Sequence, residues 1–153
     1  EAGYSMDFPT DPPEPIDPDP LIEEALGVPP LETWRGTDDY LALLESQEQL
    51  EQLEPDFELI KSLNARGLVV TAPGQNTDIA SRCFFPSLRV HEDPVTGSAH
   101  TMLAPFWLEK LGKTSFSAVQ GKDRKGFLHC TLIDDRVLLA GEAVTFLQGT
   151  IHL

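Results

Sequence analysis

One stretch near the middle of the chain, residues 98–111, constrains the fold more than any other part of the sequence. Its length suits a helix, and its apolar side chains fall on nearly every helical face. A helix that is hydrophobic all round is buried on all sides. Strand-like segments precede and follow it, so we expect an α+β domain in which a curled, barrel-like antiparallel sheet wraps around one central helix. Pro105 removes one helical hydrogen bond, which predicts either a kink at this residue or a helix that starts late. The apolar residues are Ala99, Met102, Leu103, Ala104, Phe106, Trp107, Leu108 and Leu111.

Several segments around this helix have the apolar runs and turn residues of strands. Residues 68–72 end at a Pro-Gly turn and residues 79–85 end at Pro86, so the two can pair across a polar turn. Residues 127–133 and 136–141 flank two aspartates, which predicts a hairpin. We expect two further segments to continue that sheet as a meander, residues 143–147 and 149–151.

The first part of the chain differs in character from the rest. Residues 4–8 alternate like the end of a strand, and the proline-rich residues 9–20 predict an extended connector. We therefore assign residues 1–20 to the tail of something that began earlier and a linker. Residues 21–153 are assigned to the domain itself.

Two helical segments are expected at the beginning of this domain. Residues 21–27 have acids early and a glycine at the stop, which is typical of a short helix. Residues 38–63 have helical spacing in their second part. Residues 40–44 fit a helix or a buried strand, because periodicity does not separate the two in so short a run.

Charge limits the class of partner. The chain carries 25 acids against 11 bases, and its net charge of −14 argues against nucleic acid, whose phosphates need a basic surface. Residues 1–58 hold 17 acids and Arg35 as their one base, whereas residues 59–153 hold 8 acids and 10 bases. An anionic ligand is therefore expected in the second part.

The sequence also bears on the cellular compartment. No run of about 18 apolar residues is present to span a bilayer, and the N-terminus does not resemble a secretory signal. We therefore expect no membrane partner. Cys83 and Cys130 lie among apolar residues without a CxxC motif, which favours buried free thiols in a reducing, cytoplasmic compartment.

Residues 92–100 stand directly before the apolar helix and concentrate the side chains that can carry chemistry. The first amides of a helix have no internal partners, so they bind carboxylate or phosphate readily. Gly97 lets a ligand approach the backbone, and Thr96 and Ser98 add hydroxyl donors. Asp93 would lie beside the anion and could exchange a proton with it. The pattern favours proton transfer next to a carboxylate, with Asp93 catalytic and Thr96, Gly97 and Ser98 substrate-binding.

The same residues also have a structural interpretation. Asp-Pro followed by Thr-Gly-Ser is an ordinary turn and helix cap, in which Thr96 or Ser98 satisfies the first amides. His100 is more often a buried, hydrogen-bonded histidine than a catalytic one, and Arg82 more often pairs with a local acid. The remaining histidines lack metal-ligand spacing, so no metal site is expected; they are His91, His129 and His152.

The string Glu-Asp-Pro-Val-Thr-Gly-Ser-Ala-His at residues 92–100 is similar to the most distinctive stretch of the PhzF-like (phenazine biosynthesis-like) isomerase family. As a nine-residue match in the right context, it is highly specific. Further agreement extends over nearly the whole chain, at residues 6–9, 11–13, 65–72, 81–86, 103–107, 111–113, 135–137 and 141–145.

The resemblance implies a fold and an assembly. The fold is related to diaminopimelate epimerase, with two similar domains, each a barrel-like sheet around a central helix, and the active site in the cleft between them. Residues 40–44 are then a strand, and only residues 47–63 are helical. A homodimer is expected for the full-length protein.

The resemblance also implies a chemistry. Members act without a metal or organic cofactor, by acid-base proton shuttling in which a glutamate of the first domain performs the main transfer. The residues matching Asp93 and Ser98 line the opposite wall. That glutamate's segment is absent here, as are the Gly-Asn-Pro and Gly-His motifs of the first domain, so we expect the chain alone to be catalytically silent. Residues 124–128 depart from the family pattern of a paired glycine and a glutamate before the leucine, which argues against a close match of substrate.

The function expected from the sequence is therefore the C-terminal half of a cofactor-independent isomerase or epimerase that acts on a small carboxylate metabolite. The alternative is a binding or scaffold protein that has the same fold and no catalysis.

Overall fold

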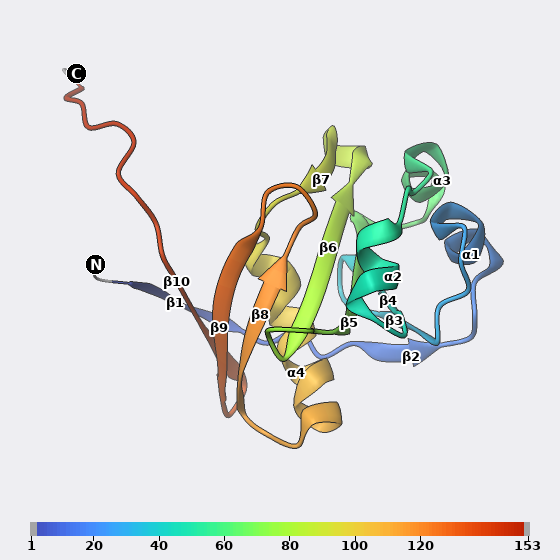
Figure 1. The fold of residues 1–153 in the computed structure, drawn as a ribbon, viewed down its shortest axis with the longest axis horizontal. Coiled ribbons are helices and arrows are strands. Elements are labelled where there is room, and N and C mark those ends of the chain that lie inside the picture. The colour runs from blue at the N-terminus through green and yellow to red at the C-terminus, as the bar shows by residue number, and fades with distance from the viewer. Residues whose placement is uncertain (1–2, 152–153) are drawn as a thin grey trace.

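The computed structural model describes residues 3–151 and contains one curled sheet with helices on both of its faces (Figure 1). Its ten strands follow the order β1-β10-β9-β8-β6-β5-β4-β3-β2, with β7 paired to β6. The strands are β1 (Tyr4–Pro9), β2 (Glu14–Ile16), β3 (Glu32–Arg35), β4 (Asp39–Leu43), β5 (Gly67–Pro73), β6 (Ile79–Phe85), β7 (Val90–Asp93), β8 (Ser115–Gln120), β9 (Gly126–Ile133) and β10 (Arg136–Gly141). The helices are α1 (Pro20–Leu26), α2 (Gln47–Gln52), α3 (Phe57–Ser62), the 3-10 turn η1 (Pro86–Leu88) and α4 (Gly97–Leu111). His152 and the predicted domain end at residue 153 lie outside the described residues.

The sheet is mixed, and the prediction of an antiparallel sheet is wrong in this respect. The expected pairs β5 with β6 and β9 with β10 are antiparallel, but β4 pairs parallel with β5 and β6 pairs parallel with β8. Parallel neighbours need a crossover connection of about a dozen residues or more. The chain supplies one crossover through α2 and α3 and another through β7 and α4.

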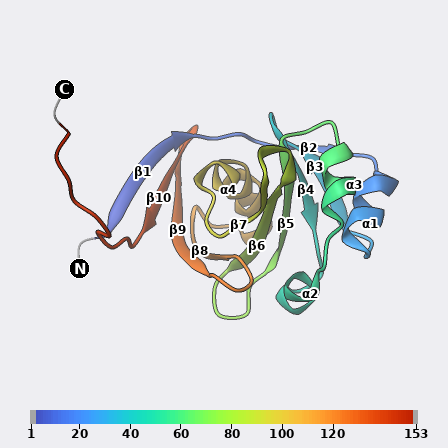
Figure 2. The ribbon, with the colours of Figure 1, turned by 90° about the horizontal axis from the view of Figure 1, so that it is seen from above.

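The two faces of the sheet bury two separate apolar clusters. Figure 2 shows α4 within the curve of the sheet and α1, α2 and α3 outside it. The inner cluster joins α4 to alternate strand residues such as Leu41, Val69 and Cys83, and the outer cluster contains Leu68 and Val70. Strand β5 is therefore buried on both faces, which explains its continuous apolar run.

Helix α4 is buried along most of its length despite the proline inside it. Its side chains Ala99, Met102 and Leu103 have almost no exposed surface. The helix begins at Gly97 and contains Pro105. Because Pro105 has no N–H, the carbonyl of Thr101 loses its helical partner. That carbonyl accepts a hydrogen bond from the backbone N–H of Asp11 at 3.0 Å instead, so the N-terminal segment satisfies the group that the proline leaves free.

The segment after β4 contains two short helices rather than one helical region. Helix α2 ends at Gln52, and α3 begins at Phe57 after the capping residue Asp56. Pro55 lies between them, and the residue before a proline is disfavoured in the helical conformation. The strand predicted at residues 40–44 is confirmed as β4, and the expected connector contains the short strand β2.

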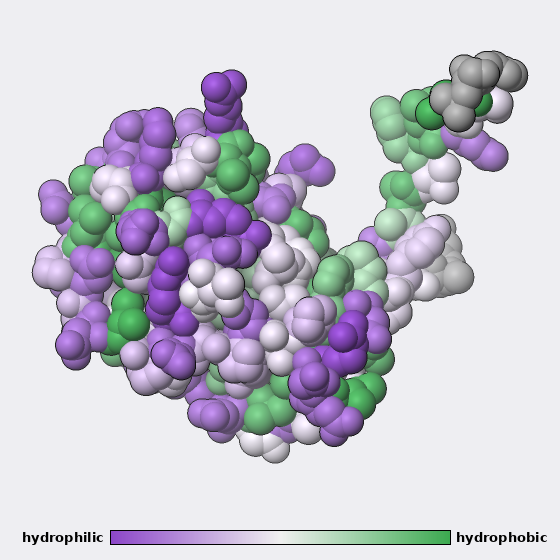
Figure 3. All heavy atoms as spheres, turned by 180° about the vertical axis from the view of Figure 1, so that it is seen from behind, coloured by the Kyte–Doolittle hydropathy of each residue, from purple (hydrophilic) through white to green (hydrophobic). Residues whose placement is uncertain are grey.

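The predicted continuation of the meander after β10 is wrong. Residues 142–151 form no regular structure, and their apolar side chains are exposed, with Phe146 at 99% and Val144 at 85%. Figure 3 shows this segment projecting from the body of the molecule with apolar side chains along it. Strand β10 already pairs with β9 on one edge and β1 on the other, so no edge is open to a following strand.

Among residues 3–151, no helix combines the length and hydrophobicity needed to cross a bilayer.

Candidate active site

The loop that the sequence singled out connects β7 to α4. Strand β7 ends at Asp93, and Thr96 is the N-cap of α4 in an extended conformation, with φ −121° and ψ 102°. The Thr96 side chain makes no capping hydrogen bond within the described residues. The capping interpretation is therefore wrong for Thr96. The first amides of α4 are left without a side-chain partner at that position.

Gly97 at the first turn of α4 is partly exposed and has room around it. A Cβ added to Gly97 would come no closer than 3.9 Å to Leu139 and 4.0 Å to Phe8. A methyl group at this position would therefore make only ordinary van der Waals contacts with these two side chains. Ser98 is exposed, as an anion cradle requires.

Gln120 at the end of β8 holds this loop in place, and the sequence did not single it out. Its side chain is fully buried. Its Oε1 accepts from the Thr96 backbone N–H at 3.0 Å, and its Nε2 donates to the Asp93 carbonyl at 2.7 Å and to the Thr96 hydroxyl at 2.9 Å. One side chain therefore fixes both ends of the turn that carries Asp93.

The carboxylate of Asp93 is half-buried and only partly engaged. Its Oδ2 accepts from the Thr96 hydroxyl at 2.8 Å, and no hydrogen bond to Oδ1 is present within residues 3–151. The Thr96 hydroxyl receives one hydrogen bond from Gln120 and gives one to Asp93, so its proton is not available to a ligand. Thr96 thus orients the aspartate rather than supplying the hydroxyl donor that the sequence suggested.

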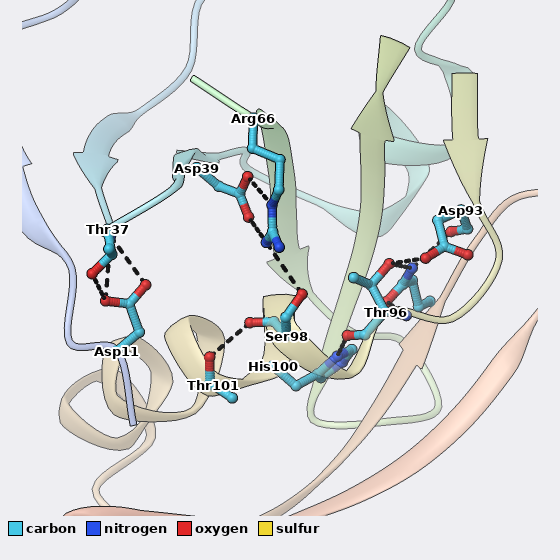
Figure 4. A network of polar contacts seen from close by, with 10 residues as sticks. Asp11, Thr37, Asp39, Arg66, Asp93, Thr96, Ser98, His100 and Thr101 are labelled. Carbon is cyan, nitrogen blue, oxygen red and sulfur yellow. Dashed lines mark hydrogen bonds and ion pairs between the residues drawn. The ribbon is translucent and has the colours of Figure 1, made fainter. Parts of the chain in front are cut away.

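A second network reaches Ser98 from the opposite side (Figure 4). Arg66, directly before β5, forms a bidentate ion pair with the buried carboxylate of Asp39. The Nε of Arg66 lies 3.0 Å from Oδ1, and Nη2 contacts Oδ2. The Asp39 hydrogen bond raises the pKa of Arg66 above its ordinary value. Nη2 of Arg66 also donates to the Ser98 hydroxyl oxygen at 3.1 Å.

Neither Asp39 nor Arg66 could be linked to the site from sequence spacing. The two residues are far apart in the chain and meet because β4 and β5 pair in parallel, with Asp39 opposite Gly67. The one available signal was a charged residue at the start of each buried strand.

These two networks border one pocket of about 180 Å³. The pocket brings together three of the four residues that the sequence predicted, Asp93, Thr96 and Ser98, and Gly97 adjoins it in the chain. Its lining residues are Arg66, Phe85, Leu88, Val90, Asp93, Thr96 and Ser98.

The remaining candidates of the loop region have structural roles. His100 is fully buried, which lowers its pKa, and its Nδ1 lies 2.9 Å from the Thr96 carbonyl oxygen. Arg82 pairs with Glu92 at 2.7 Å, as the local-acid interpretation predicted.

Cys83 and Cys130 are buried free thiols, as predicted. Burial raises the pKa of both thiols, that of Cys130 to about 12. Within the described residues, no three His, Cys, Asp or Glu side chains gather around a possible metal position.

Comparison with known proteins places this geometry in a family. The profile of the phenazine biosynthesis-like proteins (PhzC-PhzF) matches residues 21–149. An uncharacterized isomerase of Pseudomonas aeruginosa is 49% identical over 152 residues, and the mouse phenazine biosynthesis-like domain-containing protein 2 is 39% identical over 171. Each alignment covers 99% of this chain, with 58% and 59% of the respective relatives, so the chain spans about three fifths of the length of these relatives.

Solved structures agree with this assignment. The crystal structure of a PhzF-family phenazine biosynthesis protein from Enterococcus faecalis superposes with a TM-score of 0.91 at 41% identity, covering 99% of this chain and 58% of that one. A phenazine biosynthesis PhzC/PhzF protein from Clostridium difficile superposes with a TM-score of 0.88 at 39% identity over the same shares. The agreement in sequence and in fold shows that this chain belongs to the phenazine biosynthesis-like (PhzF) family.

Proposed function

We propose that this chain forms one wall of the active site of a cofactor-independent isomerase, in which Asp93 moves a proton at a carbon next to a carboxylate. The observation that carries the proposal is the half-buried Asp93 carboxylate. It faces a pocket with one oxygen held by Thr96 and the other without a hydrogen bond in the described residues. A positioned carboxylate with a free oxygen is suited to general acid-base transfer.

The surroundings of Asp93 fit the charge changes of such a reaction. When a carbon next to a carboxylate loses a proton, negative charge spreads onto the carboxylate oxygens. Preorganised donors that meet this charge lower the barrier. We assign that task to the amides of Gly97 and Ser98 at the start of α4, where the Thr96 side chain forms no cap. Gln120 and Thr96 keep Asp93 in its orientation during the transfer.

We propose that a second acid-base group shares the transfer with Asp93, so that one group removes a proton from one carbon and the other returns a proton at another. We propose that it comes from a second domain of similar, diaminopimelate epimerase-like fold, which closes the cleft over this pocket. The chain alone would then be catalytically silent, and the complete protein would work as a cytoplasmic homodimer. The isomerase name of the Pseudomonas relative supports the same class of reaction.

The experiment fuses this chain to the portion of the Pseudomonas relative that it does not cover. Deuterium incorporation from D₂O into a panel of small carboxylates is then followed by mass spectrometry. We expect exchange in the fusion and a loss of about 100-fold to 10,000-fold in Asp93→Asn, since removal of a general acid-base group has this effect. Asp123→Asn, at a surface loop, is the control and should keep the rate. Exchange at the same rate in Asp93→Asn would refute the role of Asp93, and the scaffold alternative would stand if the fusion bound carboxylates without exchanging any proton.

A further inference from the structure

The pocket beside Asp93 has two chemically different walls. One is polar and consists of Arg66, Ser98 and Asp93, and the other is apolar and consists of Phe85, Leu88 and Val90. Leu88 and Val90 are 59% and 40% exposed. Exposed apolar side chains gathered at a pocket mark a surface that receives a ligand or partner.

Arg66 faces the pocket with its geometry already fixed. The buried Asp39 carboxylate holds Nε and Nη2, and the guanidinium carbon lies 5.3 Å from the centre of the Phe85 ring. Nη1 makes no hydrogen bond within residues 3–151, and the side chain is 30% exposed. Little conformational entropy remains to be lost when Nη1 meets an anion, which favours binding.

Ser98 is oriented by the same arginine. Its Oγ accepts a hydrogen bond from Nη2 of Arg66, so its own hydroxyl proton must be donated elsewhere. Within the described residues, the Ser98 hydroxyl donates no hydrogen bond. Arg66 and Ser98 therefore present two donors side by side, which suits the two oxygens of a carboxylate.

We propose that Arg66 binds the carboxylate of the substrate and that Leu88 and Val90 bind an apolar substituent, so that the site selects small monocarboxylates with an aliphatic or ring-bearing arm. The inference rests on the proposed function, because it takes this pocket as the substrate site. The pocket volume of about 180 Å³ provides room for a carboxylate and a short arm.

The test uses the 153-residue chain and three probes that separate the two walls. The probes are 4-methylpentanoate, which has both features, 4-methylpentan-1-ol, which lacks the charge, and succinate, which lacks the apolar arm. NMR titrations follow the Arg66 Nε–H, the amides of Gly97 and Ser98, and the methyl groups of Leu88 and Val90. We expect saturable shifts with 4-methylpentanoate at all of these positions and binding at least about tenfold weaker with the other two probes. Equal affinity for the three probes, or no saturable shift at Arg66 in the tens of millimolar range, overturns the inference.

Variants identify the residues responsible. Arg66→Gln combined with Asp39→Asn removes the ion pair without leaving a buried charge unpaired. This variant should lose binding of 4-methylpentanoate about tenfold or more, whereas Arg136→Gln, which removes an exposed ion pair with Asp7, should keep it. Since the double variant could fail to fold, Ser98→Ala and Leu88→Ser, both at exposed positions, give independent tests. Unchanged affinity in these two variants overturns the inference.

Asp93→Asn distinguishes failure of this inference from failure of the proposed function. The variant should still bind 4-methylpentanoate in the isolated chain while losing proton exchange in the fusion. If Asp93→Asn loses proton exchange but the chain binds the three probes equally, the proposed substrate class alone is refuted. If the chain prefers 4-methylpentanoate but Asp93→Asn retains proton exchange, the catalytic role of Asp93 alone is refuted.

Discussion

The N-terminus of α4 differs from those of the three helices on the outer face of the sheet. Asp19, Ser46 and Asp56 cap α1, α2 and α3 with side-chain oxygens that accept from amides of the first turn. Thr96 occupies the same position in α4, but its hydroxyl donates to Asp93 instead. The outer helices thus satisfy their own ends, whereas the end of α4 is held by residues from other elements.

This difference indicates that the helix ends on the outer face serve stability, whereas the α4 end is available for ligand binding. A capped helix end contributes to folding and offers nothing to a ligand, because its amides are occupied. The α4 end depends on Gln120 and leaves its amides beside a pocket. Substitutions at the two kinds of helix end should therefore have different consequences.

The largest effect is expected at Gln120. Gln120→Leu removes three hydrogen bonds and leaves the Thr96 N–H and the Asp93 carbonyl without their partner in a buried setting. The free energy of unfolding should fall by about 2 to 4 kcal/mol, measured by urea denaturation. Gln52→Leu, on the exposed side of α2, should change it by less than about 0.5 kcal/mol. If the two variants are equally stable, the α4 loop does not depend on Gln120.

The next effect is a pH dependence from His100 in the first turn of α4. Burial lowers its pKa in the folded protein below the ordinary value of about 6.5 that it has when unfolded. The unfolded chain therefore binds more protons as the pH falls through about 6.5, and the free energy of unfolding decreases by at most about 1.4 kcal/mol per pH unit.

Urea unfolding at about pH 7.5 and about pH 5.5 measures this dependence. His100→Gln should flatten it, because the substitution removes the buried imidazole. The same slope in wild type and in His100→Gln would show that other groups cause the dependence.

A smaller effect compares a capped with an uncapped helix end. Asp56→Ala removes the acceptor for two amides of α3 and should lower the free energy of unfolding by about 1 kcal/mol. Ser98→Ala at the start of α4 should lower it by less than about 0.5 kcal/mol. Thermal unfolding of the two variants side by side distinguishes them, and an equal loss would contradict the contrast between the helix ends.

The smallest effect on stability is expected at Gly97. Gly97→Ala adds a methyl group that meets no atom closer than 3.9 Å and restricts the unfolded chain, so stability should rise by about 0.5 kcal/mol. The methyl group would face Leu139 and Phe8, which do not line the pocket, so binding of 4-methylpentanoate should be unchanged. Gly126→Ala is the opposite case, because its Cβ would lie 1.8 Å from Val95, and it should destabilise the fold. A loss of stability in Gly97→Ala would show that the fold does not accommodate this methyl group.

Local sequence patterns were sufficient for the elements with short-range signals. Apolar residues on nearly every face identified α4, the turn residues identified the β9–β10 hairpin, and the Asp-Pro-Val-Thr-Gly-Ser string identified the loop before α4. Each of these features is decided within a few residues, by hydrophobic burial or by turn chemistry, so the sequence by itself determined them.

Only the tertiary structure decided which distant residues complete the site. Parallel pairing of β4 with β5 brings Asp39 to Arg66, and the position of β8 brings Gln120 under the loop. The end of the sheet was likewise decided at long range, because β1 occupies the edge of β10 that the residues after Gly141 would need. Strand pairing joins segments that are far apart in the chain. The spacing of residues within one segment therefore does not predict which other segment it pairs with.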